Sequence, residues 1–287
     1  MKTFRYGDGD RGEVIAFRSS TCELISHINQ LDVYYPLLSV SSKTPVLFFI
    51  YGGGFDTGEK SLSPKTFGLV YANVAAYFAQ RGFVVVIPDY RLVPNVTFPG
   101  PAEDVRDALR WVVQNKECLV SAASINPDTD GIILMGHSAG AAHIATMLFL
   151  TDVLPKGDPL RARVRAAILE SPPFDLSGMT MDWPTSEAHA NYWGTLDEAK
   201  EYDPLHLFRR LEQEVIEKLP RILMVEGEFE PEWLIDAGKV FHKEVKDKTG
   251  EDLRVVVAKG HNHVSLNWAL STGEGEEWAE EVIEWLR

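Results

Sequence analysis

A short apolar run, a tight turn with a serine at its centre and a longer apolar run follow one another in residues 131–150. The turn reads GHSAG over residues 136–140, with Ser138 in the middle. The first run has the length of a strand and the second that of a helix, so the segment predicts a strand, a sharp turn and a helix. Glycine two residues before and after the serine removes Cβ atoms that would collide in so tight a turn. We therefore expect a strained, exposed serine at the turn.

Apolar runs of strand length recur along the chain and are separated by longer segments with helical spacing. Continuous apolar runs suit strands that helices cover on both faces. The order is two early strands without a helix between them, followed by repeated strand–helix units, which predicts a mostly parallel sheet in an α/β protein. We expect eight strands and one domain over residues 1–287. The predicted strands are residues 13–18, 31–35, 45–50, 83–87, 131–135, 164–169, 221–225 and 253–258, and the predicted helices are residues 65–80, 102–119, 205–217 and 275–286.

The segment of residues 171–219 is too long for a simple connection between the sixth and seventh strands. It contains Trp183, Tyr192 and Trp193. It leaves the sheet at the edge where ligands bind in α/β proteins. We expect residues 171–219 to form a small cap over the site. The alternative is a surface insertion whose aromatic residues pack into a core of their own.

Composition narrows the class of partner. The net charge of −14 argues against nucleic acid and anionic membranes. No stretch has the length of a membrane span, and the first twenty residues lack the apolar region of a signal peptide. Cys22 and Cys118 are too few for a disulfide framework, which favours a reducing compartment. We expect a cytoplasmic protein that acts on a small molecule; the sequence leaves the oligomeric state open.

A serine hydroxyl is a poor nucleophile, so Ser138 needs a nearby imidazole, and that imidazole needs a carboxylate to orient it. His261 and His263 follow the last predicted strand. Glu228 and Glu230 follow the seventh. Parallel strands end at one edge of the sheet, so either member of each pair could reach the serine. The residues alone leave both choices open.

A second signal is the sequence YGGGF at residues 51–55, directly after a predicted buried strand. Bare backbone of this kind can present N–H groups to a developing negative charge on oxygen. Alone it would pass for an ordinary glycine turn, but together with the serine turn it predicts an oxyanion hole. His137 and His143 flank the serine without the acidic or cysteine cluster that would complete a metal site, so we expect no metal and no cofactor.

Together these motifs resemble those of the α/β-hydrolase fold. Within that fold the chain is similar to carboxylesterases of the hormone-sensitive-lipase type, close to their short, arylformamidase-like members. The resemblance covers about residues 45–270. It rests on YGGGF at 51–55, on DYRL at 89–92 with Phe98, Pro99, Glu103 and Asp104, on the serine turn, and on the late acid and histidine.

The resemblance implies a role for each candidate. Ser138 would be the nucleophile, His263 rather than His261 the base, and Glu230 rather than Glu228 the orienting acid. Related esterases usually have an aspartate at the position of Glu230. A glutamate can orient an imidazole equally well if its backbone lies slightly further back.

By the same resemblance, Gly53 and Gly54 donate two N–H groups to the oxyanion, and Ala139 donates a third. The family usually has a histidine where Tyr51 stands, and we expect the tyrosine hydroxyl to replace its hydrogen bond. The DYR block at residues 89–91 is expected to brace this loop without taking part in the chemistry.

The implied function is a serine hydrolase that cleaves carboxylic esters of small or medium acyl groups through an acyl-enzyme. Phe55, Trp183, Tyr192 and Trp193 are the residues that we expect to line its pocket. One alternative is an arylformamidase, which hydrolyses an N-formylkynurenine-type amide. A more distant alternative is a binding protein without catalysis, which the presence of both Ser138 and a late histidine disfavours.

Overall fold

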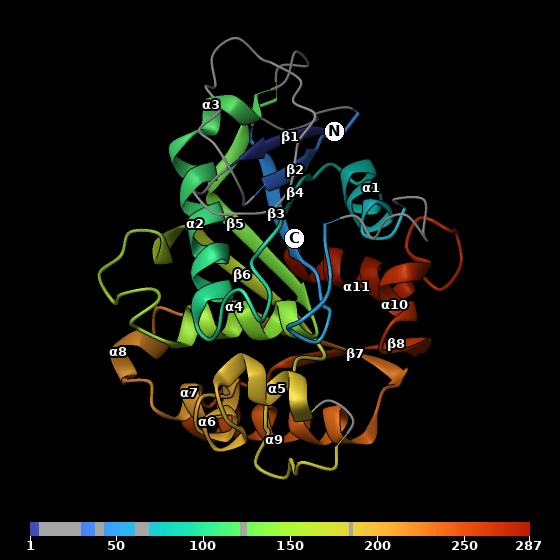
Figure 1. The fold of residues 1–287 in the computed structure, drawn as a ribbon. Coiled ribbons are helices and arrows are strands. Elements are labelled where there is room, and N and C mark those ends of the chain that lie inside the picture. The colour runs from blue at the N-terminus through green and yellow to red at the C-terminus, as the bar shows by residue number, and fades with distance from the viewer. Residues whose placement is uncertain (6–29, 38–42, 61–68, 121–124, 184–185) are drawn as a thin grey trace.

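The computed structural model describes residues 1–5, 30–37, 43–60, 69–120, 125–183 and 186–287. The described strands form a single sheet in the order β1-β2-β4-β3-β5-β6-β7-β8 (Figure 1). The two strands at the β1 edge are antiparallel to their neighbours, and all pairs from β4 to β8 are parallel. The strands are β1 (Lys2–Arg5), β2 (Gln30–Tyr34), β3 (Thr44–Ile50), β4 (Val84–Pro88), β5 (Pro127–His137), β6 (Val164–Glu170), β7 (Arg221–Phe229) and β8 (Arg254–Asn262).

Helices cover both faces of this sheet. Figure 1 shows α2 and α4 on one side and α1 and α11 on the other. The helices before β6 are α1 (Ala72–Gln80), α2 (Gly100–Gln114), α3 (Lys116–Leu119), α4 (Ala139–Phe149) and the 3₁₀ turn Arg161–Arg163. Those after it are α5 (Ser186–Trp193), α6 (Leu196–Glu201), α7 (Pro204–Arg209), α8 (Gln213–Ile216), α9 (Glu232–Thr249), α10 (Ser265–Ala269) and α11 (Glu277–Leu286).

The central strands are buried because helices cover both their faces. All five residues of β4 and the last six of β5 are buried, as their continuous apolar runs predicted. Burying one large aliphatic or aromatic side chain contributes about 1.5–3 kcal/mol. The sheet interior is therefore a rigid base from which the strand ends project loops at one edge.

Seven of the eight predicted strands overlap observed strands, whereas several other elements differ from the prediction. Residues 2–5 form β1, which the sequence pattern missed, and the predicted strand at 13–18 lies outside the described residues. The single helix predicted over 102–119 is two helices, because both the backbone N–H and the side-chain Nδ2 of Asn115 donate to the carbonyl of Trp111 and end α2 there. The helix predicted over 205–217 is likewise divided into α7 and α8.

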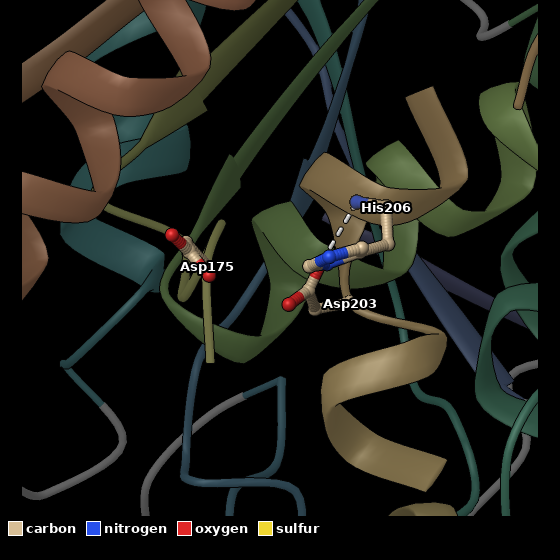
Figure 2. A group of neighbouring side chains, drawn as sticks. All are labelled: Asp175, Asp203 and His206. Atoms are coloured by element: carbon tan, nitrogen blue, oxygen red, sulfur yellow. Dashed lines mark hydrogen bonds and ion pairs between the residues drawn. The ribbon is translucent and has the colours of Figure 1, made fainter. Parts of the chain in front are cut away.

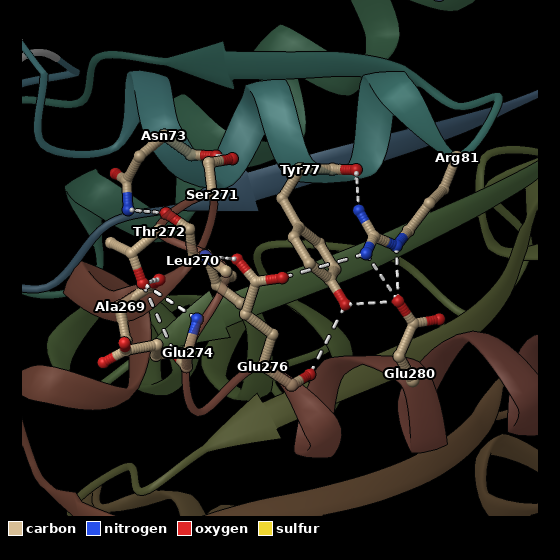
Figure 3. Close-up of polar contacts among 11 residues, drawn as sticks. Asn73, Tyr77, Arg81, Ala269, Leu270, Ser271, Thr272, Glu274, Glu276 and Glu280 are labelled. Atoms are coloured by element: carbon tan, nitrogen blue, oxygen red, sulfur yellow. Dashed lines mark hydrogen bonds and ion pairs between the residues drawn. The ribbon is translucent and has the colours of Figure 1, made fainter.

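Polar side chains on α1 bind the C-terminal segment (Figure 3). The Nδ2 group of Asn73 donates to the carbonyls of Asn267 at 2.7 Å and Leu270 at 3.0 Å. One turn further on, Tyr77 Oη donates to the Glu280 carboxylate at 2.7 Å. The short helix α10 directly follows His263, so these contacts also restrain the loop that carries this histidine.

Two further findings concern the cysteines and the helices. Cys118, in α3, is disulfide-bonded. Among the helices of the described residues, none combines the length and the apolar character needed to cross a bilayer. The cytoplasmic location stays a prediction.

Candidate active site

Ser138 occupies the turn between β5 and α4 with φ 53° and ψ −121°, a conformation that L-residues rarely adopt. Its N–H donates to the carbonyl of Glu170 at 2.8 Å, so the strand pairing of β5 and β6 continues into the turn. A Cβ atom at Gly136 would lie 2.9 Å from the backbone N of Ala141, and one at Gly140 would lie 2.2 Å from the carbonyl oxygen of Ile50. The two glycines are therefore required by close backbone approach, to α4 in one case and to β3 in the other.

We expect Gly140→Ala to lower the free energy of unfolding by about 1–3 kcal/mol, because the added methyl overlaps rigid strand backbone. Alanine would otherwise favour a helical position over glycine by about 1 kcal/mol, so the sign itself tests the clash. The measurement is denaturant unfolding of Gly140→Ala and of Gly178→Ala. The second variant is the control, since a Cβ at Gly178 meets nothing within 4 Å. Equal stabilities for the two variants would contradict the steric argument.

Three side chains from distant parts of the chain form a continuous hydrogen-bond relay. Nε2 of His263 lies 2.9 Å from Oγ of Ser138, and its Nδ1 lies 2.8 Å from Oε2 of Glu230. Glu230 follows β7 and His263 follows β8, so the parallel strands bring both to the edge where β5 ends. With Nδ1–H donating to the carboxylate, Nε2 is left free to accept the serine proton.

The competing residues point elsewhere. Nε2 of His261 bonds the carbonyl of Gly275 at 2.8 Å, and its Nδ1 lies 3.2 Å from Oγ of Ser265. Glu228 is exposed and accepts the N–H of Gly260 at 2.8 Å. The geometry thus brings His263 and Glu230 to Ser138, whereas His261 and Glu228 hold loop backbone.

Glu230 is held as a carboxylate although it is buried. Burial alone would raise its pKa, but the hydrogen bond and charge of His263 outweigh this, together with bonds from Ser171 and the N–H of Gly227. The net effect is a pKa below the ordinary value of a glutamate. Oγ of Ser171 donates to Oε1 at 2.5 Å, which leaves Oε2 for the histidine.

The glycine loop after β3 lies beside the serine. Gly53 has φ 147° and Gly54 has φ 65°, both in the region that favours glycine. The carbonyl of Gly53 accepts the N–H of Thr57 at 3.0 Å and its hydroxyl at 2.6 Å, which closes the loop on itself. Ala139 is the first residue of α4, so its N–H belongs to the helix start, where backbone donors lack intrahelical partners.

The DYR block braces this loop. Oη of Tyr51 donates to Oδ1 of Asp89 at 3.1 Å, and Oη of Tyr90 donates to the carbonyl of Tyr51 at 2.7 Å. Lys60 binds the same Asp89 carboxylate through its ammonium group at 2.9 Å. Arg91 pairs with Asp104 of α2. The Tyr51 hydroxyl therefore links the glycine loop to Asp89 of this block.

The two histidines next to the serine are buried and neutral. Burial lowers the pKa of both His137 and His143 to about 3, and the positive charge of His263 adds to this effect at His137. Nε2–H of His137 donates to the carbonyl of His263 at 2.6 Å. His137 therefore holds the backbone of the loop that carries the base.

A cavity of about 410 Å³ opens onto the serine and the histidine. Phe55 lines it, as predicted from the sequence. Trp183, Tyr192 and Trp193 are not among its lining residues. Aromatic and apolar residues that the sequence analysis did not name form much of the wall. Four of them lie close in sequence to the late acid and histidine, and the fifth, Tyr71, lies just before α1: Trp233, Leu234, Val264, Trp268 and Tyr71.

Burial explains why two of the predicted pocket residues are absent from the cavity. Tyr192 and Trp193 of α5 are 1% and 5% exposed and pack against Phe55, with ring centroids 4.5 and 4.9 Å from it. Trp183 contacts Trp233 at 5.6 Å and so supports the wall from outside. The segment 171–219 contributes Pro173 and His189 to the cavity. Its buried aromatic residues pack in one cluster with Phe55 and Ala139, outside the segment, so they do not form a core of their own.

A second polar cluster lies away from the cavity (Figure 2). Asp175, Asp203 and His206 place possible ligand atoms within 4.8 Å of one another. Oδ1 of Asp203 accepts both the N–H and Nδ1–H of His206 at 2.8 Å, which caps the start of α7, and Oδ2 accepts the N–H of Leu176 at 2.9 Å. These bonds already use both carboxylate oxygens, so we assign the cluster a structural role.

Relatives of this chain include much longer proteins. A non-reducing polyketide synthase of Preussia isomera is 37% identical over 119 residues, which cover 41% of this chain and 5% of that protein. Phenmedipham hydrolase of Pseudarthrobacter oxydans is 28% identical over 273 residues, which cover 90% of this chain and 49% of that protein. The chain therefore spans a small part of the first relative and about half of the second.

Among solved structures, a thermophilic esterase of Thermogutta terrifontis with propionate bound matches with a TM-score of 0.63 and 26% identity, covering 90% of this chain and 88% of that chain. This similarity and the sheet topology confirm the predicted α/β-hydrolase fold. The sequence profile of the BD-FAE family matches residues 31–205, more than half of the chain. The chain belongs to the BD-FAE family of α/β-hydrolases.

Proposed function

We propose that this chain is a carboxylesterase that uses Ser138, His263 and Glu230 as a catalytic triad. The observation that carries the proposal is the relay from the serine hydroxyl through the imidazole to a buried carboxylate, with links of 2.9 and 2.8 Å. Two of the similar proteins are described as a hydrolase and an esterase, which supports the same reaction class.

The reaction follows from the geometry. Ser138 Oγ attacks the ester carbonyl while Nε2 of His263 takes its proton, and Glu230 stabilises the imidazolium. The negative charge on the carbonyl oxygen is held by N–H groups of Gly53, Gly54 and Ala139, each of which is worth roughly 2.7–4 kcal/mol in serine enzymes. The imidazolium then protonates the leaving alcohol. Water, activated by the same imidazole, releases the acid and restores the serine.

The cavity limits the substrate. Its wall is largely apolar, with Trp233 and Trp268 on it, and a volume of about 410 Å³ suits a small or medium ester. We propose that residues 1–287 act as one catalytic unit, in which the segment 171–219 supplies one wall of the cavity through Pro173 and His189.

Substrate preference is tested with purified protein on p-nitrophenyl acetate, p-nitrophenyl butyrate and N-formylkynurenine. We expect hydrolysis of both esters with kcat/KM at least about tenfold above that for the formamide, a difference of about 1.4 kcal/mol in transition-state binding. Preference for N-formylkynurenine would instead assign the arylformamidase reaction. Absence of turnover on all three, with no labelling of Ser138 by a fluorophosphonate, would leave a binding protein.

A further inference from the structure

The end of strand β6 contacts two members of the relay, Ser138 and Glu230, and the helix that follows the third. The carbonyl of Glu170 accepts the N–H of Ser138 at 2.8 Å. The side chain of the next residue, Ser171, donates to Glu230 at 2.5 Å. The carboxyl group of Glu170 accepts Nδ2–H of Asn267, on the helix that follows His263, at 2.7 Å. Of these contacts, the last is made by a buried acid that the proposed mechanism does not use.

Two atoms in this contact lack partners. Glu170 is 0% and Asn267 1% exposed, and Oε1 of the acid and Oδ1 of the amide are buried without a hydrogen bond among the described residues. Both are acceptors when the acid is ionised, so neither can satisfy the other. A protonated carboxyl is a donor, and an acid and an amide that share one hydrogen bond can close a second one into a cyclic pair. One proton on Oε1 would supply the missing bond.

The surroundings favour that proton. Burial raises the pKa of Glu170 to about 8, and the negative charge of Glu230 adds to the shift, against the opposing hydrogen bond from Asn267. Two other titratable groups lie around it. One is Tyr71, whose pKa is raised in part by the charge of Glu170, and the other is His263, which lies beyond Glu230. Of the described groups that act on this carboxyl, none is a cation.

We propose that Glu170 is a positioning residue that works as a neutral acid: its protonated carboxyl forms a two-bond pair with Asn267 and so holds α10 and the His263 loop in register with Ser138. Asn73 holds the same helix from the other side through the carbonyl of Asn267 at 2.7 Å. Ionisation of Glu170 would break one bond of the pair and place a second negative charge near Glu230. The proposal rests on the esterase function proposed above.

The decisive variant is Glu170→Gln, because glutamine is neutral at every pH and can form the same pair with Asn267. The kcat/KM of the wild type on p-nitrophenyl acetate should fall above pH 8. At one pH unit above the pKa of Glu170, kcat/KM should be about a tenth of its plateau value. Glu170→Gln should match wild type within about threefold at pH 7 and stay flat to pH 9.5. Glu226→Gln is the matched control: burial and Glu230 also raise the pKa of Glu226, and this variant should keep the wild-type profile.

Three results would overturn the proposal. They are a flat wild-type profile up to pH 9.5, an unchanged alkaline fall in Glu170→Gln, and a loss above about 100-fold at pH 7 in a folded Glu170→Gln protein, which would mean that the carboxylate is required. Glu170→Leu adds a further check, since it is neutral but cannot bond Asn267. It should lower kcat at all pH values with little change in KM.

Unfolding gives a readout that does not depend on catalysis. Because the pKa of Glu170 is raised from 4.5 to about 8, the folded protein holds a proton that the unfolded chain releases, so wild type should lose stability as pH rises through this window. The denaturant midpoint of wild type should fall relative to Glu170→Gln between pH 5 and 8. Parallel midpoints would overturn the neutral pair even if no ester were hydrolysed, which separates its failure from that of the proposed function.

Discussion

Replacing Ser138 with alanine is expected to lower kcat on p-nitrophenyl acetate by roughly six orders of magnitude, as in other serine enzymes whose nucleophile is removed. The reason is that the acyl group then has no oxygen to bond to, while the cavity and the oxyanion donors stay in place. Binding should change little, because the lost hydroxyl makes no apolar contact. Steady-state kinetics, with a fluorophosphonate that labels wild type once, measures both effects.

Ser177→Ala is the matched control, since this serine is exposed on the segment after β6 and its hydroxyl donates to the Asp175 carboxylate, away from the relay. It should keep wild-type turnover and labelling. If the kcat of Ser138→Ala were within tenfold of the wild-type value, Ser138 could not be the nucleophile. Binding and the oxyanion donors alone are expected to leave far less activity than that.

Glu230→Gln is expected to cost about 10⁴-fold in kcat, the effect seen when the orienting acid of a serine protease becomes an amide. Glutamine can turn its NH₂ group toward Nδ1 of His263. The imidazole would then carry its proton on Nε2 and could not accept one from Ser138. The loss should fall on kcat far more than on KM, because the substrate does not touch the acid.

Glu228→Gln tests the same chemical change two residues away. Glu228 is exposed and bonds the N–H of Gly260 and the Lys259 ammonium, so its amide should keep kcat within about twofold. If the two variants ranked in the opposite order, or if both lost activity equally, the acid of the relay would have to be reassigned. Circular dichroism of both variants shows whether the fold is intact.

Much of this architecture could be predicted because it depends on local pattern. The buried runs of β4 and β5 show no alternation, and such runs suit a strand only where helices cover both faces. The serine turn was equally predictable, since a strand that turns this sharply into a helix needs glycines such as Gly136 and Gly140. β1 was missed because its four residues, KTFR, carry almost no apolar signal.

Local pattern could not identify which of two equivalent residues reaches the site. His261 lies at the end of β8 and His263 just after it, and Glu228 and Glu230 lie likewise around the end of β7, so only the path of the backbone selects one of each. Tyr192 and Trp193 were predicted to line the pocket but are buried in a core, because an aromatic residue has the same hydrophobicity in either place.

The sequence by itself determined the parallel sheet, the strained serine and the set of residues that could act with it, because each depends on neighbours a few positions apart. The tertiary structure brought together the His263 and Glu230 that the family resemblance had implied, and it alone decided that Trp233 and Trp268 form the cavity wall and that Glu170 lies against Asn267. Those contacts join residues 33 to 125 positions apart along the chain in the relay and 97 apart in the buried pair. Contacts at such separations exist only once the strands have paired and their ends have been brought to one edge of the sheet.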